Sequence, residues 1–128
     1  MLIDTTFLDK MDLNSPAQLA EGIAKLLDSR KGIDVTVIDL MDKTVVADYF
    51  VIASATSTTG VKALADYVES ELNKRGINCL HSDVDPKWVA KGFSGVIVHV
   101  FYDELREFYS LERLWAEGNN IKKFKDAD

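Results

Sequence analysis

Two apolar runs constrain the fold of this chain more than any other feature of its sequence. The run from Tyr49 to Ala53 is continuous, which is typical of a strand that is buried on both faces of a sheet. The run from Val96 to Phe101 is rich in β-branched residues and gives the strongest strand signal in the chain. Both runs therefore predict strands, and elements that bury them must be found elsewhere in the sequence.

Two helices are predicted from their end signals. Ser15 is a candidate N-cap with Pro16 at the first helical position, and Gln18 three residues later completes a capping box. This helix is expected to end at Gly32. A second apolar stripe at helical spacing begins at Val61 and is expected to end at Gly76.

Weaker signals complete the order of elements. Strands are expected at 34–40, 77–81 and 88–93, a loop at 82–87, and a short helix from Asp103. The resulting order α-β-β-α-β-β-β-α predicts the α/β (α+β) class, with a mixed β-sheet and flanking helices. We expect residues 1–14 to be an N-terminal extension, 15–117 a single domain, and 118–128 a polar tail that frays.

Composition excludes several classes of protein. The 128 residues are 47% apolar and carry a net charge of −6, which argues against a broad nucleic-acid surface because such surfaces depend on clustered Lys and Arg. The single cysteine, Cys79, cannot form a disulfide within the chain or a multi-cysteine zinc site. No apolar run is long enough to cross a bilayer, and the first residues resemble no targeting signal. We expect a cytoplasmic protein.

Asp83 and Asp85 are the most suggestive candidates for catalysis. In extended chain they project to one face, where two carboxylates can hold Mg²⁺ and position a nucleotide phosphate, as in nucleotidyltransferases. However, no Gly-Ser precedes a helix at the place where those enzymes grip the phosphate, and Pro86 suggests a turn. A magnesium-dependent nucleotidyltransferase therefore stays as the alternative, and solvated loop acids are the simpler interpretation.

Other polar residues give weaker signals. The hydroxyl-rich stretch 54–60 lacks a phosphate-binding fingerprint, so helix capping is favoured over anion binding. Cys79 and His81 are close in sequence, but a lone cysteine is more often a small buried residue than a nucleophile. His99 lies in the apolar strand and is either a core histidine or part of an interface. No metal and no cofactor are expected.

Three stretches together resemble the ribosomal silencing factor family, also called the Iojap family. The first is residues 48–57 with the helix that follows, the second is Trp88 with the strand 95–101, and the third is residues 106–115. Their order and spacing match over most of the chain. The resemblance implies a nucleotidyltransferase-like core without catalytic residues, and a protein that is not an enzyme.

The resemblance also implies a function and a partner. Family members bind the large ribosomal subunit through its basic ribosomal protein L14 and sterically block association with the small subunit, which represses translation. No further nucleic-acid contact and no membrane are expected. A homodimer of the free protein is compatible with this function. A dimeric scaffold protein that does not bind the ribosome is a weaker alternative.

Site residues are carried over position by position. The implied partner-binding residues are Trp88, Val89, Lys91 and Phe93, with Trp88 and Phe93 as anchors. Gly92 and Gly95 stand where most family members have acids, so the segment from Trp88 to Phe101 has one charged residue and no acid. The matched C-terminal residues Arg106, Tyr109, Glu112, Arg113 and Trp115 are expected to pack a terminal helix.

Overall fold

The computed structural model describes residues 5–41, 45–109 and 120–123 of the chain. A 3₁₀ helix η1 (Thr6–Lys10) precedes three α-helices: α1 (Pro16–Ser29), α2 (Thr58–Asn73) and α3 (Asp103–Tyr109). The strands are β1 (Ile33–Asp39), β2 (Tyr49–Ala55), β3 (His81–Asp85), β4 (Trp88–Phe93), β5 (Val96–Tyr102) and β6 (Ile121–Lys123). None of the helices in these ranges has the length and apolar character needed to cross a bilayer.

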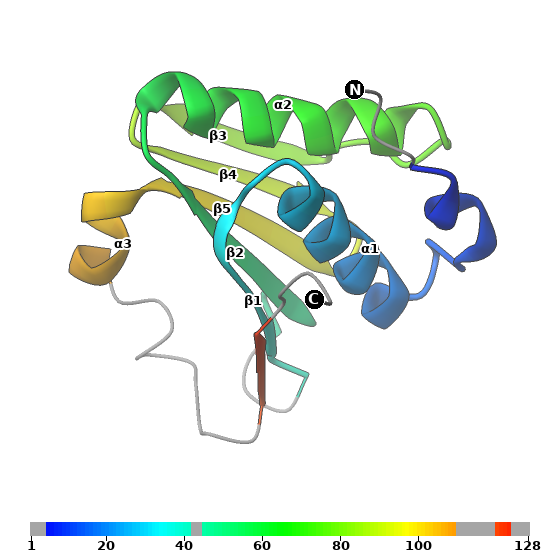
Figure 1. The fold of residues 1–128 in the computed structure, drawn as a ribbon. Helices are drawn as coiled ribbons and strands as arrows, with labels where there is room; N and C mark the ends of the chain where they lie inside the picture. Colours follow the sequence, from blue (N-terminus) through cyan, green and yellow to red (C-terminus); the bar gives the residue numbers. More distant parts are fainter. Residues whose placement is uncertain (1–4, 42–44, 110–119, 124–128) are drawn as a thin grey trace.

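The strands form one mixed sheet in the order β3-β4-β5-β2-β1-β6. Only the central pair β2 and β5 is parallel among the strand pairs of the described residues. Figure 1 shows α1 and α2 lying over one face of this sheet, with α3 after the end of β5. The α+β class with a mixed sheet and flanking helices is therefore confirmed.

The two apolar runs form β2 and β5, the central strands of the sheet. Each of these strands packs against other residues on both of its faces. On β5, Val96, Val98 and Val100 join the core beneath α1 and α2. Phe101 and Ile97 point to the other face, where they pack in a second cluster with residues of β1 and β2. A strand that has apolar contacts on both faces reads in sequence as a continuous apolar run.

The start of α1 follows its sequence signal with one difference. Ser15 Oγ accepts a hydrogen bond from the Gln18 backbone N–H at 3.4 Å, as an N-cap does. The Gln18 side chain accepts from the N–H of Asp12 at 2.9 Å, so its carbonyl fixes the chain before the helix. At the other end Lys31, not Gly32, adopts the left-handed conformation with φ 68°.

Two predictions along the chain are wrong. The strand expected at 77–81 lies instead at His81–Asp85, in the segment predicted as a loop. An edge strand can carry acids on its solvent side, which makes it resemble a loop in sequence. The tail predicted to fray contributes Ile121–Lys123 as β6, paired with β1.

The segment before residue 15 also takes part in the core. Leu8, which lies in this segment, is 1% exposed and belongs to the core.

Candidate functional site: the two faces of strand β4

The four residues implied as partner contacts are divided between the two faces of β4. Val89, Lys91 and Phe93 point toward α2 and are only 3%, 6% and 4% exposed. Trp88 points to the opposite face and is half-buried there. Side chains alternate along a strand, so a continuous segment of sequence cannot present all four on one surface. Whether any of them contacts a partner stays a prediction.

Trp88 is held in an aromatic cluster that we call the aromatic face: Phe50, Trp88, His99 and Phe101. The Trp88 ring stacks on Phe101 with a centroid distance of 5.1 Å and an interplanar angle of 24°. Its indole Nε1–H donates to His99 Nδ1 at 3.1 Å. Phe50 meets the His99 ring edge to face at 4.7 Å. Phe101 and His99 therefore fix the orientation of the Trp88 ring, and Phe50 packs against His99.

His99 is a neutral core histidine at the centre of the aromatic face. Burial lowers the pKa of its imidazole to about 4. Because Nδ1 accepts from Trp88, the proton of the neutral ring is on Nε2, which has no hydrogen-bond partner among the residues that the structure describes. Protonation of Nδ1 would replace this acceptor by a donor and break the bond from Trp88.

The opposite face of β4 is stabilised by apolar packing and one ion pair. Val89 and Phe93 belong to the main core with residues of α2. Lys91 Nζ lies 2.7 Å from Glu69 Oε1 on α2 and 3.3 Å from Ser82 Oγ on β3. Val89, Lys91 and Phe93 therefore attach β4 to α2. Of the four implied contact residues, Trp88 alone is not buried in this structure.

Strand β3 brings acids beside the aromatic face. Asp85 pairs across the sheet with Trp88, and Asp83 pairs with Ala90, so both carboxylates project from the same face as Trp88. Asp83 is exposed and lies 3.0 Å from His81 Nε2. Within the described ranges no group of three or more His, Cys, Asp or Glu side chains could hold a metal ion. The geometry required for the nucleotidyltransferase alternative is thus not found there.

The two glycines at the positions of the expected acids differ in their constraints. Gly95 has φ +79°, and a Cβ there would lie 2.8 Å from Asp48 Oδ2 and 3.1 Å from Pro16 Cγ. A side chain at Gly95 would therefore be strained and would collide. At Gly92 the nearest atoms to an added Cβ are those of His81, at 3.6 and 3.7 Å, an ordinary contact distance. Position 92 can accept a side chain and position 95 cannot.

The hydroxyl-rich stretch has structural roles. Ser57 is the N-cap of α2, and its Oγ accepts from the Gly60 N–H at 2.9 Å, as the capping interpretation predicted. Ser54 is fully buried and accepts from the Arg106 guanidinium at 3.1 Å. Arg106 also donates to Thr36 Oγ1 at 2.9 Å, so it joins α3 to the sheet. The side chains of Tyr109, Glu112, Arg113 and Trp115 lie outside the described residues.

Cys79 shows no arrangement for nucleophilic catalysis. Its thiol donates to the backbone carbonyl of His81 at 3.1 Å. The thiol hydrogen bond therefore goes to a backbone carbonyl and not to the His81 ring, which is paired with Asp83.

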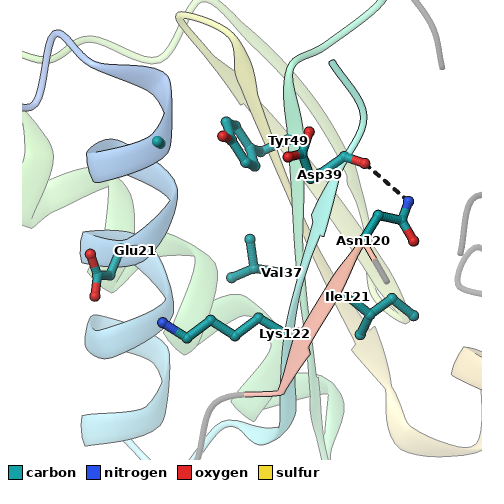
Figure 2. A pocket seen from close by; sticks show the side chains of 8 residues that line it. Glu21, Val37, Asp39, Tyr49, Asn120, Ile121 and Lys122 are labelled. Carbon is teal, nitrogen blue, oxygen red and sulfur yellow. Dashed lines mark hydrogen bonds between the residues drawn. The ribbon is translucent and has the colours of Figure 1, made fainter. Parts of the chain in front are cut away.

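A small pocket of about 280 Å³ lies between α1 and the β1–β6 edge (Figure 2). Two of its polar groups are already used: the Tyr49 hydroxyl donates to Met41 Sδ at 3.8 Å, and the Asn120 amide donates to the Asp39 carbonyl at 3.0 Å. Burial, with the charges of Asp39 and Asp48, raises the pKa of Tyr49. A ligand site needs polar groups that converge on the cavity. This pocket is therefore a weaker candidate for the functional site than the aromatic face.

Comparison with known proteins places this geometry in context. The family model described as "Ribosomal silencing factor during starvation" matches residues 13–128. A Haemophilus influenzae protein named ribosomal silencing factor RsfS is 32% identical over 100 residues, which cover 77% of this chain and 98% of that protein. A mouse protein named mitochondrial assembly of ribosomal large subunit protein 1 is 31% identical over 110 residues, covering 81% of this chain and 46% of its own length. A crystal structure from Chromobacterium violaceum superposes with a TM-score of 0.73 at 27% identity and covers 92% of this chain and 95% of that one.

Proposed function

The chain belongs to the ribosomal silencing factor family, and from this premise we propose that it represses translation by binding the large ribosomal subunit. The contact is with the basic ribosomal protein L14, and the bound protein blocks association with the small subunit. The observation that carries the proposal is the family match over residues 13–128. The site of action is the cytoplasm, where ribosomal subunits meet.

The mechanism is steric and needs no chemistry at the site. A folded chain of 14.3 kDa on an intersubunit contact occupies the space that the small subunit requires. Inhibition then depends on affinity and position alone. This agrees with an aromatic face that offers a shaped, half-buried ring.

We assign the contact to the face of the sheet that carries Trp88. Tryptophan is enriched at interface hot spots because it combines a large apolar area with a polar N–H. The carboxylates of Asp83 and Asp85 flank it on β3 and complement a basic partner. Val89, Lys91 and Phe93 support this surface from below by attaching β4 to α2.

Co-sedimentation with isolated large subunits tests the contact. Trp88→Ala should weaken binding by at least about tenfold, since a hot-spot residue contributes about 2 kcal/mol or more. Trp88→Phe keeps the stacking on Phe101 and removes the N–H donor to His99, so it separates ring area from the hydrogen bond. Circular dichroism of each variant establishes that the fold is retained. Unchanged affinity of a folded Trp88→Ala variant would refute the assignment.

Gly92→Asp tests the same surface in the opposite direction. The added carboxylate lies on the face of Trp88 and should strengthen binding to a basic partner by a fewfold at low salt. Thr59→Asp on α2 adds the same charge on the opposite layer, where it should leave binding unchanged. Equal effects of the two substitutions would mean that net charge, and not this face, governs the affinity.

Inhibition of subunit joining tests the function itself. Purified protein at saturating concentration should prevent large and small subunits from forming joined ribosomes. Normal joining of the subunits while the large subunit is saturated with this protein would refute the proposed repression. Binding to the large subunit would still be shown by the same experiment.

A further inference from the structure

Strand β3 ends the sheet within the part of the chain that the structure describes, so one of its edges has no neighbouring strand there. The Tyr102 N–H donates to the Lys87 carbonyl at 2.7 Å, while Trp88 and Phe101 are direct cross-strand partners. Bonds between the residues that flank a pair mark it as non-hydrogen-bonded, so the N–H and C=O of Trp88 point toward β3. Asp85, which pairs with Trp88, therefore directs its own backbone groups to β4.

Ser82 and Val84 are the residues of β3 whose backbone groups face the outer edge. Backbone direction alternates along a strand, so His81 and Asp83 face β4. The N–H of Leu80 also points inward and donates to β4 at 2.8 Å. Ser82 and Val84 each offer one N–H donor and one C=O acceptor, which is what an added strand needs in order to pair with a sheet edge.

On the side of α2, this edge leaves an apolar layer uncovered. Val84 pairs with Val89, so the two side chains project from the same face of the sheet. Val89 is 3% exposed beneath α2, whereas Val84 is 70% exposed. An apolar side chain on an added strand would extend this layer and remove Val84 from water.

On the opposite face the same edge is acidic. Asp83 and Asp85 project from the face of Trp88, and the Asp83 carboxylate is exposed. Opposite charges across a strand pair are stabilising, and like charges are destabilising. The edge therefore favours a strand with Lys or Arg on the face of Trp88 and apolar residues on the face of α2.

We propose that β3 binds an extended protein segment of the large ribosomal subunit as a further strand, and that basic residues alternate with apolar ones in this segment. The pairing rests on the proposed function and specifies how the partner is held. Main-chain bonds at Ser82 and Val84 set the register, and the alternating side chains give the specificity. Because Asp85 lies directly opposite Trp88, the added strand runs beside the aromatic face.

Co-sedimentation of the full chain with isolated large subunits tests the pairing with a matched pair of variants. Val84→Pro removes an outward N–H, and proline is tolerated on an edge strand where the N–H faces solvent. Val84→Ala loses the same apolar side chain and keeps the N–H. We expect Val84→Pro to bind at least about fivefold more weakly than Val84→Ala, since this ratio corresponds to about 1 kcal/mol for one main-chain hydrogen bond. Circular dichroism establishes that both variants are folded.

Hydrogen exchange of the wild-type chain tests the same bonds without a substitution, so it decides the question even if Val84→Pro does not fold. In the free protein the amides of Ser82 and Val84 should exchange faster than those of His81, Asp83 and Asp85, which face β4. Saturation with large subunits should slow the exchange of Ser82 and Val84 by at least about tenfold.

The possible outcomes separate this pairing from the proposed function. Equal affinities of the two folded variants, or unchanged exchange of the Ser82 and Val84 amides on saturated subunits, would overturn the pairing and leave ribosome binding intact. Slow exchange of these amides in the free protein that depends on its concentration would assign the edge to a second copy and would also overturn it. A wild-type protein that does not bind large subunits would refute the proposed function and this pairing with it.

Discussion

The two faces of β4 have different neighbours. On one face, Val89, Lys91 and Phe93 meet α2. The other face carries Trp88, Ala90 and Gly92. The first group is buried by apolar packing and an ion pair with Glu69. The second group lies between β3 and β5, and its Trp88 belongs to the aromatic face. One strand thus serves stability with one set of side chains, and we propose that the other set forms the contact surface. Substitutions on the two faces should separate these roles.

The largest effect is expected from Phe93→Ala. Removal of a buried phenyl ring leaves a cavity beneath α2 and should lower the free energy of unfolding by about 3–5 kcal/mol. Urea denaturation measures this loss. The folded fraction should still bind large subunits with wild-type affinity, because the cavity lies on the far side of β4. A loss below about 1 kcal/mol would contradict the assignment of Phe93 to the core.

Acid should destabilise the protein through the aromatic face. The pKa of His99 is lowered to about 4, against about 6.5 in the unfolded chain, so the unfolded state binds more protons between these values. Stability is therefore fully present above pH 6.5 and decreases as the pH falls toward 4, by about 3 kcal/mol in total.

Denaturation curves across this pH window measure the slope. His99→Gln should flatten the dependence relative to the wild type, because it removes the buried imidazole. Tryptophan fluorescence should report the same transition, since protonation of His99 breaks the bond from Trp88. A slope in His99→Gln equal to that of the wild type would assign the titration to other groups.

Lys91 should affect stability more modestly. Lys91→Ala removes the ion pair with Glu69 and leaves a gap, and we expect a loss of about 2 kcal/mol, because Glu69 is partly exposed and can be rehydrated. Lys91→Met fills the same space without charge and should lie within about 1 kcal/mol of the wild type. Neither variant should alter binding to large subunits at equal folded fraction. A specific loss of binding would return Lys91 to the contact surface.

The smallest effect is expected at Gly92. Gly92→Asp should change stability by less than about 1 kcal/mol, because the added Cβ meets only ordinary contacts. Gly95→Asp is its counterpart in the same hairpin and should lower stability by about 2 kcal/mol, since φ is +79° and the carboxylate of Asp48 is adjacent. Thermal melting of the two variants compares them directly.

Local patterns predicted much of the fold. The continuous run at β2 and the β-branched run at β5 identify central strands, because apolar contacts on both faces leave no polar positions in the sequence. Ser15 and Pro16 locate the start of α1 for a similarly local reason. β3 and β6 were missed because an edge strand needs little hydrophobicity, and its pairing partner is distant in sequence.

The sequence by itself determined the family, the helix caps and the central strands, since each depends on residues that are close along the chain. Only the tertiary structure decided which side of β4 each residue occupies and what lies across from it. The segment from Trp88 to Phe101 contains no acid, yet Asp85 lies directly opposite Trp88 through the pairing of β3 with β4. Hydrogen bonds between β3 and β4 bring the Asp85 carboxylate to the aromatic face. The charge composition of a sequence segment cannot reveal a neighbour that is set by strand register.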